Sequence, residues 1–84
     1  MIGDNIKFYR KKNQLTQDDI AEACNVTRQA VSKWENGESL PTVDNLYALS
    51  RLLHTSVDDI LIGEKERDDE PSLSFSFYIF FGFL

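Results

Sequence analysis

Cysteine and histidine are almost absent from the sequence, with Cys24 and His54 as the only examples. One cysteine cannot close a disulfide within the chain, and one residue of each type cannot form a Cys/His zinc site. The first residues also lack the basic, apolar and small-residue succession of a secretory leader. We therefore expect a cytoplasmic protein that folds without disulfides and without a metal ion.

The sequence also lacks the arrangements that usually carry catalysis. It has no glycine-rich phosphate loop, no Ser or Cys nucleophile with a plausible histidine partner, and no paired carboxylates around a cleft. The sequence therefore predicts neither an enzyme nor a cofactor. Its 84 residues suffice for one small domain with one core.

Positive charge is scarce overall, and a net charge of −5 argues against a nucleic-acid partner. The charge is unevenly distributed, however. Residues 1–37 carry six basic and five acidic side chains, whereas residues 64–84 carry two basic and five acidic ones. Residues 64–84 alone thus contribute −3 to the net charge, and the objection to nucleic acid loses weight for the N-terminal half.

Apolar residues recur at three- and four-residue steps between turn signals, which predicts an all-α domain of five helices. The first helix ends at Asn13 and Gln14, and the third ends at the Asn36-Gly37 pair. Each later helix begins at a Ser or Thr that can cap it, namely Thr16, Thr27, Thr42 and Ser56. The five helices carry the following apolar residues: Ile2, Ile6 and Tyr9; Ile20, Ala21 and Cys24; Ala30, Val31 and Trp34; Leu46, Leu49 and Leu53; Val57, Ile60 and Leu61.

The second and third helices, from Gln17 to Asn36, have the pattern of a helix-turn-helix motif. Ala21 is small enough for a close helix crossing, and Asn25 tolerates the left-handed conformation that the three-residue turn requires. The outer face of the third helix is polar and carries no acid. Such a helix fits the DNA major groove, where Arg or Lys pairs with guanine and Gln with adenine.

Three stretches, LTQDDIAE at 15–22, VTRQAVSKWENG at 26–37 and Leu40-Pro41, resemble the lambda-repressor-like DNA-binding family of the Cro and xenobiotic-response-element type. The resemblance covers about residues 3–62 and implies a five-helix domain that binds operator DNA, usually as a dimer, and regulates transcription. Two departures stand out. Asn25 replaces the usual glycine, and Glu38 occupies a loop position that is basic in many members.

The resemblance also implies the residues that contact DNA. Base contacts would come from Arg28, Gln29 and Lys33, with Ser32 as a lesser candidate. Phosphate contacts would come from Gln17, Thr27, Asn36 and Arg10. It further implies a buried ion pair between Arg10 and Glu35, which divides Arg10 between a structural role and a phosphate contact.

Three other residues have ordinary structural interpretations. Trp34 is spaced to lie in the core, and Cys24 is expected to be a small buried apolar side chain. His54 is expected on the surface between the fourth and fifth helices.

The chain changes character after Gly63. Residues 64–71 form a charged linker, and residues 72–84 form an apolar, aromatic extension. Three interpretations of the extension stay open: a β-strand that pairs across a dimer or packs on the domain, the start of a severed membrane anchor, and a flexible end. As a helix, residues 73–84 would rise only about 18 Å, less than the roughly 30 Å of a bilayer core.

The sequence therefore predicts a DNA-binding domain at residues 1–63 that acts as a transcriptional repressor. We expect a homodimer on a pseudo-palindromic operator of double-stranded DNA. Two alternatives remain. One is an antitoxin-like interaction module whose residues 72–84 occupy a protein partner. The other is the DNA-binding head of a membrane-tethered regulator, which requires that the chain be a truncation.

Overall fold

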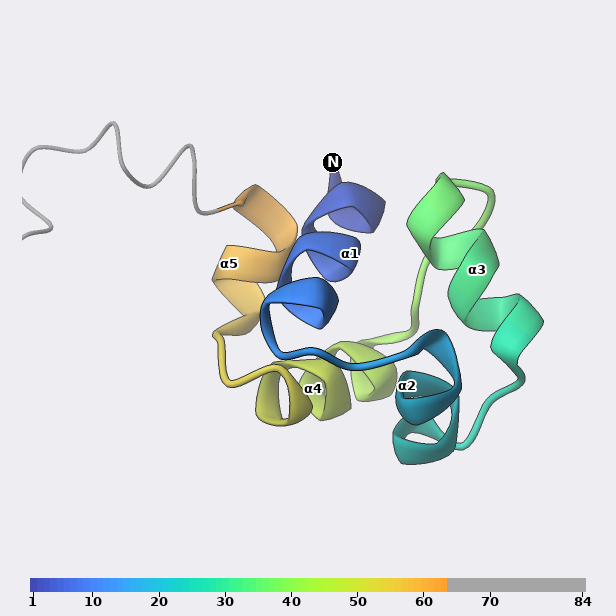
Figure 1. Ribbon diagram of the computed structural model, residues 1–84. Coiled ribbons are helices and arrows are strands. Elements are labelled where there is room, and N and C mark those ends of the chain that lie inside the picture. Colours follow the sequence, from blue (N-terminus) through green and yellow to red (C-terminus); the bar gives the residue numbers. More distant parts are fainter. Residues whose placement is uncertain (64–84) are drawn as a thin grey trace, which may run out of the picture.

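The computed structural model describes residues 1–63, so the predicted linker at 64–71 and extension at 72–84 lie outside the described residues. Five α-helices follow one another: α1 (Ile2–Lys12), α2 (Gln17–Cys24), α3 (Arg28–Asn36), α4 (Val43–Leu52) and α5 (Val57–Ile62). As Figure 1 shows, α1 lies between α3 and α5 and packs against both, while α2 packs against α3 and α4, and α4 against α5. The predicted five-helix all-α fold is thus confirmed over the described residues.

The predicted helix starts are confirmed by their caps. The hydroxyls of Thr16, Thr27, Thr42 and Ser56 each accept a hydrogen bond from the backbone N–H three residues further on. At α2 the bond is reciprocated, because the Asp19 carboxylate accepts from the Thr16 backbone N–H at 2.8 Å. These bonds satisfy backbone donors that a helix leaves unpaired in its first turn.

Among the helices of residues 1–63, α1 to α4 each end near a residue in the left-handed conformation. The backbone N–H of the next residue donates a hydrogen bond to the carbonyl five positions back. Asn25 (φ 58°) and Gly37 (φ 80°) do so as predicted. Gln14 (φ 60°) and His54 (φ 56°) adopt the same conformation, although neither was expected to be left-handed. His54 is exposed, as predicted.

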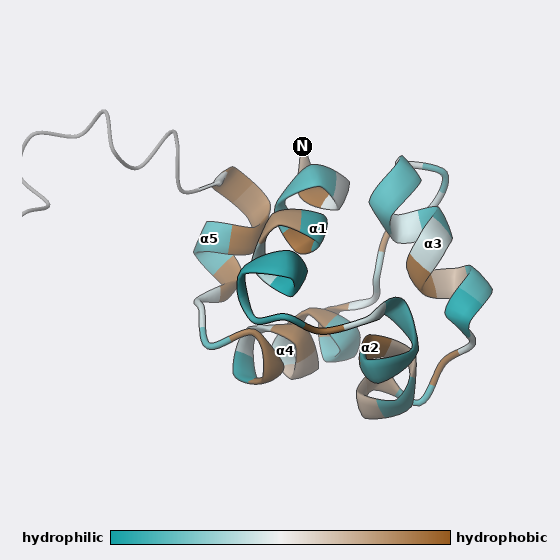
Figure 2. Ribbon diagram, viewed as in Figure 1, coloured by the Kyte–Doolittle hydropathy of each residue, from teal (hydrophilic) through white to brown (hydrophobic). Residues whose placement is uncertain are grey.

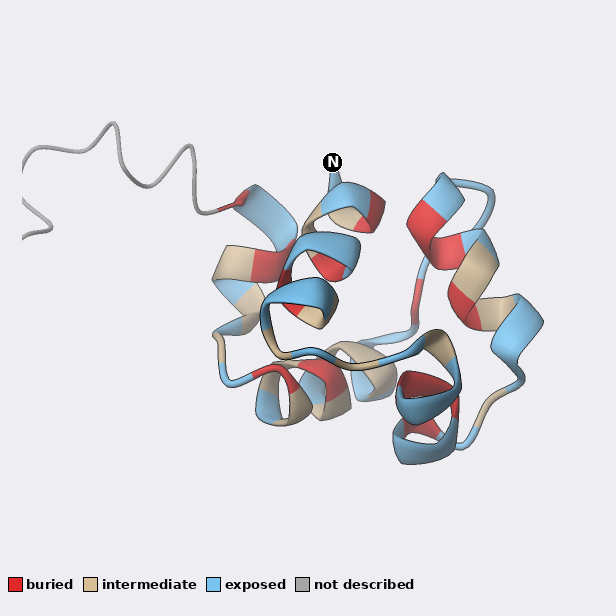
Figure 3. Ribbon diagram, in the orientation of Figure 1, coloured by how far each residue is buried: buried red, intermediate tan, exposed pale blue. Residues whose placement is uncertain are grey.

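The core lies where the five helices meet, and the apolar faces of the ribbons turn toward it (Figures 2 and 3). Trp34 and Cys24 are buried there, as predicted, and burial raises the pKa of the Cys24 thiol. Among residues 1–63, ten apolar residues are buried: Ile6, Tyr9, Ile20, Ala21, Cys24, Val31, Trp34, Leu49, Leu53 and Ile60.

The apolar residues of α5 are less uniformly buried than their spacing suggests. Ile60 is fully buried, but Leu61 is 43% exposed. A helix of six residues with one face against α1 and α4 can turn only a small part of its surface to the core. Of the helices formed by residues 1–63, none has the length and apolarity needed to cross a membrane.

Candidate nucleic-acid interface

The inward faces of α2 and α3 determine which residues of the motif reach the surface. Ala21 is buried where α2 and α3 pack together, and Asn25 reverses the chain in the left-handed conformation. Val31 and Trp34 anchor α3 to the core. Because a helical side chain lies on the same face as those three and four positions away, the remaining face of α3 points outward.

The predicted base-contacting residues lie on this outer face. Arg28, Gln29 and Lys33 are exposed, and Ser32 is half-buried. Arg28, Gln29 and Ser32 line one shallow depression together with Gln17 from α2. The structure therefore brings three of the four predicted base contacts beside one predicted phosphate contact, while Lys33 follows in the last turn of α3.

The acid of α3 is turned away from this surface. Glu35 is only 8% exposed, and its carboxylate accepts hydrogen bonds from Arg10 Nε at 2.7 Å and Arg10 Nη2 at 3.2 Å. The Gln17 amide donates to the same carboxylate at 3.1 Å. The predicted Arg10–Glu35 ion pair is thus present, and it leaves the outer face of α3 without a negative charge.

The guanidinium of Arg10 donates all its described hydrogen bonds within the domain. Its third nitrogen, Nη1, donates to the Leu15 carbonyl at 3.0 Å, and the side chain is 13% exposed. This geometry agrees with the structural role of Arg10 that the family resemblance implies. A phosphate contact from Arg10 stays a prediction.

The other predicted phosphate contacts lie at helix ends. Gln17 is the first residue of α2, Thr27 caps α3, and Asn36 is the last residue of α3. Thr27 and Asn36 are exposed, whereas Gln17 is half-buried because of its bond to Glu35. The N-termini of α2 and α3 also present unpaired backbone N–H groups, which favour an anion such as phosphate.

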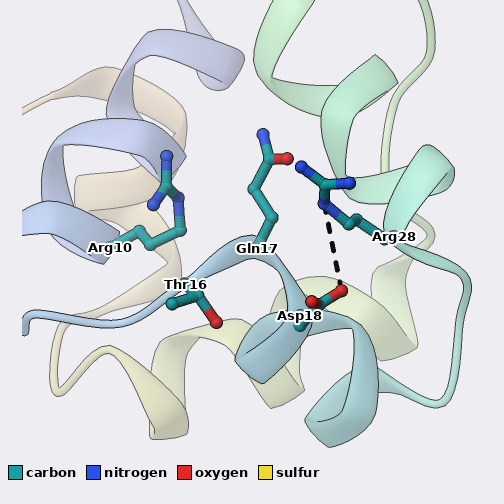
Figure 4. A pocket seen from close by; sticks show the side chains of 5 residues that line it. All are labelled: Arg10, Thr16, Gln17, Asp18 and Arg28. Carbon is teal, nitrogen blue, oxygen red and sulfur yellow. Dashed lines mark ion pairs between the residues drawn. The ribbon is translucent and has the colours of Figure 1, made fainter.

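Sequence reasoning missed one charged residue of this surface, Asp18. The Arg28 guanidinium lies 3.9 Å from the Asp18 carboxylate, measured from Nε to Oδ1, and both side chains are exposed. Figure 4 shows the pair beside Gln17, in a hollow whose lining residues are Arg10, Thr16, Gln17, Asp18 and Arg28. No local spacing could reveal this pair, because it depends on the packing of α2 against α3.

The chain is similar in sequence to known proteins of one family. The pattern of the helix-turn-helix family (HTH_3) matches residues 6–60. The HTH-type transcriptional regulator DicA of Escherichia coli is 40% identical over 70 residues, which are 83% of this chain and 52% of DicA. The chain spans about half the length of this curated relative.

Two solved structures have a similar fold. The c2 repressor of Salmonella phage P22 in complex with a synthetic operator has a TM-score of 0.71 and 36% identity, over 76% of this chain and 97% of that one. The Bacillus subtilis regulator of biofilm formation SinR, in complex with DNA, has a TM-score of 0.65 and 34% identity, over 73% of this chain and 98% of that one.

Proposed function

The chain belongs to the helix-turn-helix family, in its lambda-repressor-like branch, and on that basis we propose that it binds a specific double-stranded DNA operator and regulates transcription. One observation carries the proposal. The outer face of α3 presents Arg28, Gln29, Ser32 and Lys33, while Glu35, the acid of this helix, is buried against Arg10. DicA and the P22 c2 repressor, which are named as a transcriptional regulator and a repressor, favour this function over the antitoxin-like and membrane-tethered alternatives.

In this proposal α3 lies in the major groove and reads base edges. Arg28 and Lys33 donate hydrogen bonds to guanine O6 and N7, and Gln29 pairs with adenine N6 and N7. Ser32 is less exposed and has a shorter side chain, so it contributes a lesser contact to a base edge.

Phosphate contacts set the register of α3 in the groove. Gln17 and Thr27 act from the N-terminal ends of α2 and α3, and Asn36 acts from the last turn of α3. Arg10 supports these contacts chiefly through Glu35, because the same carboxylate also accepts the hydrogen bond of Gln17.

We further infer that the protein works in the cytoplasm as a homodimeric repressor. A domain of this size reads only a few base pairs, so two copies on half-sites about 34–36 Å apart would provide the required specificity. The P22 relative is a repressor bound to an operator, which supports repression as the direction of control. A protein contact through residues 72–84 stays a prediction, because these residues lie outside the described residues.

The proposal is tested by selecting binding sites from a random DNA pool with the full chain, and then measuring affinity for the selected site and its single-base variants. Arg28→Ala should cost about 1–3 kcal/mol on the selected site and relax the preference at one base pair. Gln17→Ala should weaken all sequences alike, and its folding should be checked because Gln17 also binds Glu35.

Arg51→Ala is the matched control, since Arg51 is an exposed arginine on α4, outside the motif. It should leave the preference intact. Failure to select any sequence would contradict the proposed function, and a uniform loss of affinity in both Arg28→Ala and Gln17→Ala would contradict the assignment of α3 as the reading helix.

A further inference from the structure

An acidic side chain lies against the first residue of the proposed reading helix. Asp18 is in the first turn of α2, and its carboxylate is 3.9 Å from the Arg28 guanidinium. The side chains are 76% and 68% exposed, so the pair contributes little to folding stability. Its importance therefore lies in what it does to Arg28.

Arg28 lies where it could make either of two kinds of DNA contact. It lines the hollow at the start of α2 with Gln17 and Asp18, and it also lines the depression with Gln29 and Ser32. A long, exposed arginine in this position can reach a phosphate or a base edge, and only the second contact carries sequence information.

We propose that Asp18 is a positioning residue that determines specificity: it disfavours a phosphate contact of Arg28 and so leaves this side chain available for a base. This inference rests on the proposed function. A phosphate placed against Arg28 would also approach the Asp18 carboxylate and be repelled by it, whereas guanine O6 and N7 carry no net charge. Asp18 therefore penalises the sequence-independent partner of Arg28 more than the sequence-specific one.

The test compares wild type with Asp18→Asn on the selected site and on a scrambled duplex, each over a range of salt concentrations. The substitution should raise affinity for the scrambled duplex and steepen its log–log salt dependence by about 0.9, the value for one added phosphate contact. The ratio of specific to non-specific affinity should fall by about fivefold, which is the low end of the discrimination expected from one bidentate base contact.

Glu22→Gln is the matched control, because it removes the same charge from an exposed position one turn further along α2. It should change neither the ratio nor the salt slope by a comparable amount. Equal effects of the two substitutions would mean that only net charge matters, and would overturn the inference.

The same substitution in an Arg28→Ala background separates positioning from simple repulsion. If Asp18 acts through Arg28, Asp18→Asn should have no effect on the ratio there. A persisting effect, or no effect in the wild-type background while the wild type still selects a site, would overturn the inference and leave the proposed function standing. A wild type that selects no site would overturn both.

Discussion

Gly3 and Glu35 show at the scale of single residues how closely α1 approaches α3. A Cβ atom on Gly3 would overlap the backbone carbonyl oxygen of Trp34 and lie 2.8 Å from that of Glu35. Glu35 itself joins the two helices through Arg10. One position thus requires the absence of a side chain, and the other requires a charged one.

Gly3→Ala should destabilise the fold by about 1–3 kcal/mol, because the added methyl group meets rigid backbone rather than a movable side chain. At an ordinary glycine inside a helix, substitution by alanine has the opposite effect and stabilises the fold by about 1 kcal/mol. Urea unfolding followed by circular dichroism measures the change. Lys7→Ala on the exposed side of α1 serves as control, and an unchanged or increased stability of Gly3→Ala would refute the close approach of α1 to α3.

Glu35→Ala should cost about 3–5 kcal/mol, because it leaves the Arg10 guanidinium mostly buried without its carboxylate. Glu38→Ala removes an acid from the exposed loop that follows α3, and it should change stability by less than about 0.5 kcal/mol. The two unfolding curves, recorded under the same conditions, provide the comparison. Similar stabilities for both variants would show that the buried ion pair does not support the fold.

At the scale of the elements, the helix ends combine favourable and unfavourable features. The capping hydroxyls at the starts of α2 to α5 lie where short polar side chains satisfy backbone N–H groups. At the ends of α1 and α4, by contrast, Gln14 and His54 hold a left-handed conformation that their Cβ atoms disfavour. Stability is therefore lost at two exposed positions.

Gln14→Gly and His54→Gly should each raise the free energy of unfolding by about 0.5–1 kcal/mol, since glycine adopts positive φ without steric cost. Thermal denaturation of the single variants tests this. Lys11→Gly, inside α1, should lower stability by about 1 kcal/mol and shows the usual cost of glycine in a helix. A loss of that size in His54→Gly would contradict the left-handed assignment.

At the scale of the whole molecule, net charge is unevenly distributed along the chain. Within the described residues 1–63, the ten buried apolar residues lie between Ile6 and Ile60. Residues 64–84, with five acidic and two basic side chains, account for −3 of the net charge of −5. Residues 1–63, with seven basic and nine acidic side chains, carry a net charge of only −2, which suits the proposed DNA-binding surface better than the charge of the full chain.

A fragment of residues 1–63 should fold, with a free energy of unfolding within about 1 kcal/mol of the full chain, because these residues alone form a core of ten buried apolar side chains. Sedimentation of both proteins tests the proposed dimer. We expect a dimeric full chain and a monomeric fragment if residues 72–84 form the dimer contact. A dimeric fragment would place that contact within the helical domain, and an unfolded fragment would contradict the expectation that residues 1–63 fold by themselves.

The sequence by itself determined the five helices, their capping residues, most of the core and the polar outer face of α3. Each of these depends on interactions among residues within about one helical turn, which spacing and residue type reveal directly. The turn at Asn25 is of the same kind, because the conformational preference of one residue decides it. The Arg10–Glu35 pair was accessible only through the family resemblance, since 25 residues separate its partners.

Only the tertiary structure decided the close approach at Gly3, the bond from Gln17 to Glu35, the exposure of Leu61 and the pairing of Asp18 with Arg28. All four depend on where one helix lies relative to another. That placement is set by the packing of the whole core, and a shift of a few ångströms leaves every local pattern unchanged while it makes or breaks such a contact. For this reason the polar outer face of α3 could be predicted from the sequence, whereas the acid beside its first arginine could not.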